Sequence, residues 1–173
     1  LKKINSASIM QTTIKTKSLK ETFKLFEEIK KEPYSVAWID CLAKGGQLGR
    51  SHVMYGNFMS DGELKIKKHL TLNIPFFFPN FTLNKWTVKV FNWLYYNRQR
   101  SKKKVSKVDF NSFFYPLDSI NNWNRIYGRQ GFLQYQFILP LDVSYNGVKE
   151  ILEILSKSGK GSFLAVLKLY GEQ

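Results

Sequence analysis

The chain has 173 residues, of which 43% are hydrophobic and 16% aromatic. A chain of this length and composition folds as one domain that buries roughly 70% of its unfolded surface, and intrinsic disorder is excluded. Lys and Arg number 27 against 13 Asp and Glu, which gives a formal net charge of +14. We therefore expect an anionic partner: a nucleic acid, an anionic membrane surface or a phosphorylated substrate.

The few cysteines and histidines restrict the chemistry that the chain can support. Cys41 is the only cysteine, so no intramolecular disulfide can form and a reducing, cytoplasmic location is expected. With Cys41, His52 and His69 as the only soft ligands, a closed zinc site cannot be built, and we expect no metal. No apolar run reaches the ~20 residues that a transmembrane helix needs. The chain begins at Leu1 rather than Met, and we expect an excised fragment or a processed product.

The first third of the chain predicts a strand, a helix and a hairpin. Alternating residues at 8–16 indicate a strand, and Ser18 with Glu21 three residues later has the spacing of a helix capping box. The helix that follows ends before Pro33. Two further strands joined by a glycine-rich turn come next, at 34–41 and 50–58.

The middle of the chain is less regular. We interpret residues 60–107 as a lid or loop insertion that contains a helix from about Asn84 to Asn97. The basic run within 98–107 has no apolar periodicity and predicts a solvated loop. Beyond it we expect a strand at 108–115, a short helix at 116–127, a strand at 132–139, an amphipathic helix from Val148 that Gly159 ends, and a last strand at 162–170.

Strands interspersed with helices predict an α+β fold, with an antiparallel or mixed sheet and helices packed on one face. Two strand–helix–strand units, one near each end of the chain, favour a ferredoxin-like arrangement. We expect residues 1–173 to form a single domain.

Side chains on two of the expected strands are candidates for ligand binding. Gln134 and Gln136 lie on one face of their strand, and neighbouring amides suit a ligand with hydroxyl groups; a solvent-exposed face is the alternative. Lys168 shares a face with Leu164 and Val166, where a lysine is unusual. It can serve as a cation at the rim of a pocket, or its ammonium can extend to water from the end of a strand.

The other candidates each have a structural alternative. Trp38 on a strand is more often part of a core than a ligand platform, and Arg125 can clamp an anion or form a surface ion pair. The sequence contains no glycine-rich phosphate loop and no spaced nucleophile and base, so the chain supplies no redox or hydrolytic chemistry by itself. A nucleic-acid module is the main alternative class, but Ser162 and Leu164 stand where an RNA-recognition strand needs stacking aromatics.

Four blocks of sequence form a specific combination. They are YSVAWID at 34–40 with LGR at 48–50, FFYPLD at 113–118 with WNRIYG at 123–128, GFLQYQF at 131–137, and SFLAVLKLYG at 162–171. In this order the blocks resemble the decaprenylphosphoryl-β-D-ribose 2-oxidase family, whose members are flavoproteins of the vanillyl-alcohol oxidase superfamily. Agreement is poorest between Ser60 and Lys107.

In that superfamily an FAD domain made from both chain ends flanks a central substrate domain, and the chain resembles only this central cap domain. The resemblance implies that the FAD-binding segments are absent, that FAD is held mainly by the missing domain, and that the chain alone is inactive. It implies a pocket over the flavin ring, and the residues that line this pocket are Trp38, Gln134, Gln136, Leu164, Val166 and Lys168. Lys168 would also face the flavin. Arg125 would belong to a mobile segment near the mouth of this pocket.

The resemblance further implies hydride transfer from a sugar carbinol carbon to FAD, which gives a keto sugar in cell-wall biosynthesis. The substrate would be a glycosyl-phosphate lipid, a partner reductase would complete the reaction, and no nucleic acid is expected. The chain departs from the family at Phe114, Ile120 and Ala165, where the family has tyrosine, phenylalanine and asparagine. The first and last departures remove hydrogen-bonding groups near the ligand, so the resemblance does not fix the precise substrate. A sugar-lactone or alditol oxidase of the same superfamily is the alternative.

The Phe-rich segment from Ile74 to Phe81 lies near basic residues on both sides. It would suit a lid that meets a polyprenyl tail at an anionic membrane surface, and core packing is the alternative.

Overall fold

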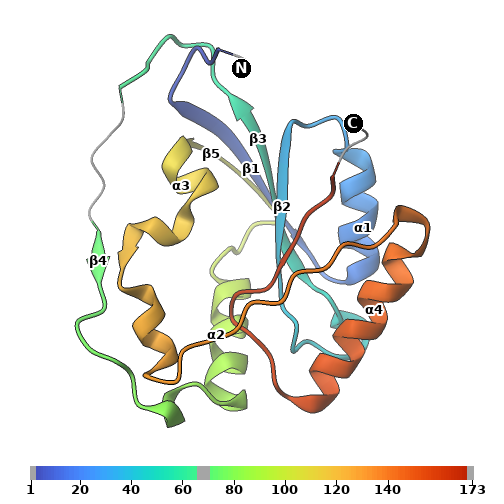
Figure 1. Ribbon diagram of the computed structural model, residues 1–173. Helices are drawn as coiled ribbons and strands as arrows, with labels where there is room; N and C mark the ends of the chain where they lie inside the picture. The colour runs from blue at the N-terminus through green and yellow to red at the C-terminus, as the bar shows by residue number, and fades with distance from the viewer. Residues whose placement is uncertain (1–2, 66–70, 171–173) are drawn as a thin grey trace. The chain divides into compact units, whose positions relative to one another are not determined.

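The computed structural model describes residues 3–65 and 71–170 (Figure 1). Its helices and strands, in chain order, are β1 (Ser8–Thr16), α1 (Leu19–Glu28), β2 (Tyr34–Ile39), β3 (Ser51–Phe58), β4 (Leu72–Asn73), α2 (Lys85–Asn97), β5 (Lys103–Asp109), α3 (Phe110–Phe114), β6 (Ile120–Asn121), α4 (Leu141–Ser158) and β7 (Val166–Leu167). Short 3₁₀ turns lie at η1 (Gly45–Gln47), η2 (Asn80–Thr82), η3 (Pro116–Ser119) and η4 (Trp123–Tyr127).

Five strands form one sheet in the order β5-β1-β3-β2-β7, and β4 pairs in parallel with β6 in a separate two-stranded sheet. Apart from β4, which belongs to the other sheet, the order β1-α1-β2-β3-α2-β5 is the βαββαβ connectivity of ferredoxin-like folds. The α+β class predicted from the sequence is therefore confirmed. The second strand–helix–strand unit is β3-α2-β5, however, and not the pair of C-terminal strands around α4.

The chain divides into two compact units. The first unit comprises Leu1–Gln11, Gly56–Leu83 and Val105–Gln134, and the second comprises Thr12–Tyr55, Asn84–Lys104 and Tyr135–Gln173. This division does not test the expectation of one domain over 1–173, because β1, β3 and β5 each contain residues of both units.

The capping signal at the start of α1 is confirmed with one difference. The Ser18 hydroxyl accepts a hydrogen bond from the backbone N–H of Glu21, 3.3 Å away, as a helix N-cap does. The Glu21 carboxylate accepts from the backbone N–H of Lys17 (2.7 Å), one residue before the position that a capping box predicts. Ser18 therefore satisfies a backbone donor that the first turn of a helix leaves open, and Glu21 satisfies one just before the helix.

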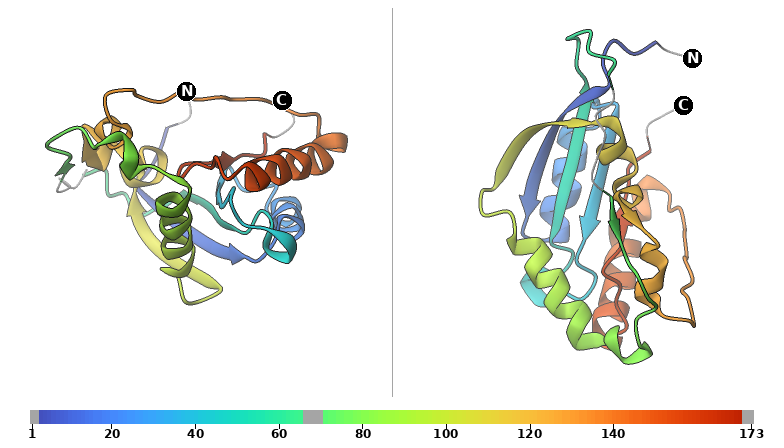
Figure 2. Two further views of the ribbon diagram at one scale, coloured as in Figure 1. Left: turned by 90° about the horizontal axis from the view of Figure 1, so that it is seen from below. Right: turned by 90° about the vertical axis from the view of Figure 1, so that its left-hand side faces the viewer.

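The core of the second unit lies between the sheet and α1. Leu25, Phe26 and Ile29 come from α1 and its C-terminal end, and they pack with Ala37 of β2 and Val53 of β3. Helix α4 lies beside α1 on this side (Figures 1 and 2), where the rings of Phe23 and Tyr145 meet edge to face at 5.3 Å. Trp38 follows Ala37 on β2 and so points to the other side, where its ring contacts Tyr95 of α2. The helices are therefore not confined to one face of the sheet.

The basic run gives the first correction to the predicted elements. Residues 103–109 form β5, an edge strand of the sheet, whereas the sequence predicted a solvated loop over 98–107. Lys103, Lys104 and Lys107 are exposed on this strand. Lysines on an edge strand oppose further strand pairing, so a high lysine content does not exclude a strand at a sheet edge. The wider segment 60–107, of which 66–70 lie outside the described residues, thus contains α2 and most of β5, and its role as a lid stays a prediction.

The region after β5 gives further corrections. The predicted strand at 108–115 is wrong beyond Asp109, because the Asp109 carboxylate accepts from the backbone N–H groups of Asn111 and Ser112 and so begins α3. The predicted single helix at 116–127 is instead the two 3₁₀ turns η3 and η4, with β6 between them.

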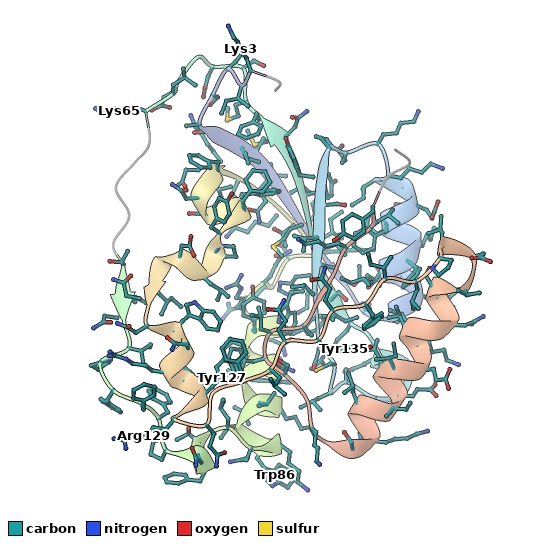
Figure 3. All side chains as sticks on the ribbon, viewed as in Figure 1. Lys3, Lys65, Trp86, Tyr127, Arg129 and Tyr135 are labelled. Atoms are coloured by element: carbon teal, nitrogen blue, oxygen red, sulfur yellow. The ribbon has the colours of Figure 1, made fainter. Side chains whose placement is uncertain are left out.

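The predicted strand at 132–139 is wrong, since residues 131–140 belong to no helix or strand. Leu133 is 99% exposed and Tyr135, whose side chain is labelled in Figure 3, is 87% exposed. Alternating residues favour an extended backbone, but a strand forms only where a neighbour supplies its hydrogen bonds. The last predicted strand, at 162–170, pairs only over β7.

Candidate functional site

The strand pair β2–β7 in the second unit carries the strongest candidate site. The strands are antiparallel, with Ala37 opposite Leu167 and Trp38 opposite Val166. Residues opposite each other in such a pair point to the same side of the sheet. Leu167 and Leu169 pack against the core, whereas Leu164, Val166 and Lys168 are exposed on the other side. The alternation that the sequence predicted for this segment is confirmed.

We name the exposed side of this strand pair the β2–β7 face, formed by Trp38, Leu164, Val166 and Lys168. Val166 is 56% exposed and Leu164 39%. Among residues 3–65 and 71–170, the Lys168 ammonium has no hydrogen-bond or ion-pair partner. A cation without a protein partner, next to exposed aliphatic side chains, can receive a ligand that has an anionic or polar end and an apolar body.

Trp38 forms the floor of this face and is only 4% exposed. Its indole N–H donates to the backbone carbonyl of Phe163, 2.9 Å away. Its ring lies 4.5 Å from the ring of Tyr95 between centroids. The hydrogen-bonding capacity of Trp38 is therefore used within the protein, and the side chain can offer a ligand only an apolar edge.

Tyr95 and His52 both pack against Trp38, and the centroid of the His52 ring lies 5.9 Å from that of the indole. Arg98 stacks on the half-buried Tyr95 ring at 3.9 Å and donates to its hydroxyl at 3.1 Å. Burial lowers the pKa of His52 to about 4, and the nearby positive charges of Arg98 and Lys15 act in the same direction. The neutral imidazole donates from Nε2 to the Tyr96 carbonyl oxygen at 2.9 Å, since a carbonyl can only accept. His52 is thus a neutral structural group at neutral pH.

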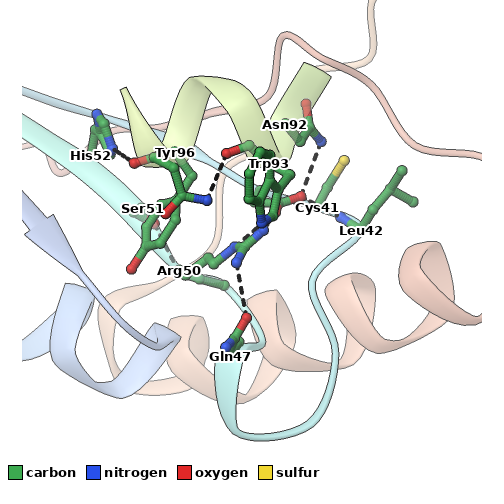
Figure 4. A network of polar contacts seen from close by, with 12 residues as sticks. Cys41, Leu42, Gln47, Arg50, Ser51, His52, Asn92, Trp93 and Tyr96 are labelled. Atoms are coloured by element: carbon green, nitrogen blue, oxygen red, sulfur yellow. Dashed lines mark hydrogen bonds and ion pairs between the residues drawn. The ribbon is translucent and has the colours of Figure 1, made fainter. Parts of the chain in front are cut away.

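A buried polar network supports the same region (Figure 4). The Asp40 carboxylate accepts from Arg50 Nε at 2.9 Å and Nη2 at 2.8 Å, from the Leu42 backbone N–H and from Asn92 Nδ2. Asp40 is 2% exposed and Asn92 is fully buried. Asn92 also donates to the Ser162 carbonyl at 3.3 Å. The network therefore ties α2 and the ends of β2 and β3 to the segment that leads into β7.

Cys41 belongs to this structural region and not to a reactive site. Its thiol donates to the Ser162 carbonyl and its sulfur accepts from the Ser162 N–H, at 3.3 and 3.2 Å. Burial raises the pKa of the Cys41 thiol, which disfavours the nucleophilic thiolate.

In the first unit, the Phe-rich segment and Arg125 are joined directly. The Arg125 Nη1 group donates to the carbonyls of Ile74 and Pro75, each at 2.9 Å, and the guanidinium lies 5.6 Å from the centre of the Phe77 ring. The parallel pairing of β4 with β6 and a hydrogen bond from Asn122 to Asn73 add to this link. Within the described residues, Nε and Nη2 of Arg125 have no further hydrogen bond, so the side chain can still meet an anion.

The remaining predicted residues are Phe114, Gln134 and Gln136. Phe114 packs against the Phe113 ring at 5.0 Å and the Phe58 ring at 6.2 Å. Gln134 and Gln136 are exposed, and they fall in the first and second units respectively. Their segment forms no strand, so the alternation of side chains along a strand does not place the two glutamines on one face. The structure brings Trp38, Leu164, Val166 and Lys168 together, and a common cleft with the glutamines stays a prediction.

The groups that support the site were not predicted from the sequence. Asp40 and Arg50 both stood in the blocks that carry the family resemblance, but their ion pair was not predicted. An acidic and a basic residue on either side of the turn between two paired strands are a usable signal for such a pair. Tyr95 and Arg98, three residues apart on a helix, are another.

Across residues 3–65 and 71–170, none of the helices has the length and apolar character needed to cross a bilayer.

Comparison with known proteins identifies a relative. No family model matches the chain. The chain is 35% identical over 148 residues to the decaprenylphosphoryl-β-D-ribose oxidase of Mycolicibacterium smegmatis (strain ATCC 700084 / mc(2)155), an alignment that covers 80% of the chain. The chain is a relative of this oxidase. It spans 32% of that protein's length. The resemblance read from the sequence is thus confirmed.

Proposed function

We propose that the chain is the substrate-binding part of an FAD-dependent oxidoreductase that oxidises a sugar hydroxyl of a glycosyl-phosphate lipid to a keto sugar. The observation that carries this proposal is the β2–β7 face, where Lys168 has no partner among the described residues and stands beside Leu164 and Val166. The identity with a decaprenylphosphoryl-β-D-ribose oxidase supports it. The missing part of the protein would hold most of the FAD, and a partner reductase would act on the product.

The chemistry of the β2–β7 face fits a flavin and its substrate. A flavin ring is flat and largely apolar with a polar edge, which suits the exposed Leu164 and Val166 side chains next to an ammonium. FAD, when bound, accepts the hydride and so supplies the redox step. Lys168 would hold a polar or anionic group, Trp38 would limit the depth of the pocket, and Gln134 and Gln136 would orient sugar hydroxyls. Arg125, through Nε and Nη2, would bind an anion near the mouth.

Removing the charge at Lys168 tests the proposal directly. In the full-length protein, Lys168→Met should weaken the affinity for a glycosyl phosphate by about tenfold to a hundredfold, since a charged hydrogen bond contributes roughly 1.5–3 kcal/mol. Binding and turnover are measured by titration and by flavin reduction, with flavin content checked by absorbance. Lys157→Met, which removes an exposed lysine from α4, is the matched control.

Several results would contradict the assignment. Equal affinity and turnover in Lys168→Met and the control would remove Lys168 from the site. Oxidation of a free alditol or a sugar lactone in preference to the glycosyl phosphate would favour the alternative oxidase. Tight, salt-dependent binding of an oligonucleotide instead of either would support a nucleic-acid module.

We further propose that the segment Ile74–Phe81 contacts the polyprenyl chain at an anionic membrane surface. Phe76 is 62% exposed and Phe81 77%, and Arg125 braces the start of the segment. In the full-length protein, Phe76→Ser with Phe81→Ser should raise KM for a long-chain substrate several-fold and leave KM for a short-chain analogue unchanged. An equal effect on both substrates would contradict a role in lipid binding. The cytoplasmic location also stays a prediction.

A further inference from the structure

Helix α2 is apolar on the side that faces away from the protein as well as on the side that packs. Its inner side buries Val88, Asn92 and Tyr96. The outer side presents four large apolar side chains at helical spacing i, i+4, i+7 and i+8, and we name it the α2 outer face, formed by Trp86, Val90, Trp93 and Leu94. These residues are 65%, 56%, 56% and 55% exposed, and Figure 3 shows Trp86 projecting from the start of the helix. A surface helix normally has a polar outer side, so this one needs a partner.

The charged residues on this helix and at its C-terminal end are all positive. Lys85 and Lys89 lie on α2 next to the outer face and are exposed, and Arg98 follows the helix. From Leu64 to Val108 the sequence contains eleven Lys and Arg residues and no Asp or Glu. The positive charges of Lys85, Lys89 and Arg98 favour an anionic surface beside the α2 outer face.

The combination of residues favours a lipid surface over a protein partner. Protein interfaces are depleted of lysine, whereas helices that lie in a membrane interface combine tryptophan and aliphatic residues with flanking lysine. With 13 residues, α2 is about 20 Å long, too short to span a bilayer but sufficient to lie within its headgroup region.

We propose that the α2 outer face inserts into the interfacial region of an anionic membrane, with Lys85 and Lys89 against lipid phosphates. The inference rests on the proposed function in one respect: a lipid-linked substrate would give the protein a reason to dock there. The contact itself requires neither flavin nor turnover. It is also separate from the Ile74–Phe81 proposal, since it uses different residues and predicts attachment and not substrate length preference.

Vesicle binding of the full-length protein tests the inference. The variant Trp86→Ser with Trp93→Ser should lower the partition coefficient onto phosphatidylcholine vesicles containing 30% phosphatidylglycerol by about tenfold or more, because two interfacial anchors are lost. Lys85→Gln with Lys89→Gln should lower it by about fivefold per lysine at low salt and have little effect on pure phosphatidylcholine. The matched control is Leu141→Ser with Val143→Ser, which removes two exposed apolar side chains of α4 and should bind as the unaltered protein does.

Other occupants of the α2 outer face give different results, and each would overturn the inference. Residue-specific oxidation of Trp86 and Trp93 by hydroxyl radicals reports whether the face is open in the lipid-free protein. Protection at every protein concentration would mean that another part of the full-length protein covers it, and protection that rises with concentration would mean a second copy. Equal vesicle binding by the Trp variant and the control would also exclude insertion of the α2 outer face into the membrane.

Turnover of a short-chain glycosyl phosphate separates this inference from the proposed function. If the Trp variant loses vesicle binding but retains turnover, the inference is supported independently of the redox role. If the unaltered protein binds vesicles through α2 but oxidises no sugar, the proposed function fails while the membrane contact stands.

Discussion

The Asp40–Arg50–Asn92 network and the β2–β7 face lie in the same unit but use charge in opposite ways. In the network, Arg50 is paired through two nitrogens with a buried carboxylate that accepts two further hydrogen bonds. On the face, Lys168 has no partner within the described residues and is exposed to solvent. The contrast indicates where function lies, because a charge that is fully paired inside the fold is not free to bind a ligand, whereas an unpaired charge at the surface is.

Breaking the buried pair should give the largest effect. Asp40→Ala leaves the mostly buried Arg50 without its counter-ion, which should lower the free energy of unfolding by about 3 kcal/mol, the low end for a broken buried pair because the Arg50 side chain is 12% exposed. Urea denaturation followed by circular dichroism measures this loss. Glu150→Ala removes an exposed carboxylate from α4 and should change stability by no more than about 0.5 kcal/mol. A loss of similar size in both variants would mean that the pair is not a structural element.

Acid should weaken the support behind Trp38 through His52. Its pKa falls from an ordinary value near 6.5 to about 4 in the folded protein, so the unfolded chain binds more protons between these values. The contribution of His52 to stability is complete above pH 6.5 and is lost as the pH falls toward 4. By pH 4.5 the loss amounts to about 2–3 kcal/mol.

Comparison with His52→Gln isolates this contribution from other acid effects. Glutamine keeps a donor for the Tyr96 carbonyl but does not titrate. The stability difference between the two proteins should shrink by about 2–3 kcal/mol from pH 7 to pH 4.5. Parallel stability curves over that range would show that His52 does not carry the linkage.

The smallest effects are expected for Val166 and Leu167, two neighbouring residues of β7 whose side chains lie on opposite sides of the sheet. Leu167 packs against the core, and Leu167→Ala should cost about 2 kcal/mol, the low end for a leucine because this side chain is only partly buried. Val166→Ala on the open side should cost under about 0.5 kcal/mol. Of the two, only Val166→Ala should weaken ligand binding without loss of stability, as measured by denaturation and ligand titration. The reverse pattern would mean that the two sides have been assigned wrongly.

Local signals in the sequence predicted the elements that depend on local interactions. Ser18 and Glu21 predicted the start of α1, and Gly159, with φ of 70°, ends α4 as expected. The alternation around Lys168 was correct because one side of that segment must face the core. The wrong predictions concern pairing: the segment 132–139 alternates but has no neighbouring strand, and β5 is a strand despite its lysines because it lies at a sheet edge.

The candidate site was predictable to a similar extent. Lys168 could be singled out because a cation among aliphatic residues on a strand is uncommon. The hydrogen bonds from Arg125 to the carbonyls of Ile74 and Pro75 could not be predicted, because every residue has a backbone carbonyl and the sequence does not indicate which one accepts. Trp38 was expected to pack on the ligand, but its depth of burial depends on Tyr95, which is distant in sequence.

The sealed indole of Trp38 makes it an optical probe of its own surroundings. Trp38 is 4% exposed and hydrogen-bonded internally, whereas Trp86 and Trp93 are 65% and 56% exposed. Dissolved iodide or acrylamide would therefore quench the emission of the two exposed indoles first, and the emission that remains would come from Trp38 and the half-buried Trp123. A change in the surroundings of Trp38, such as ligand binding at the β2–β7 face, can in this way be followed by tryptophan fluorescence, without an attached dye.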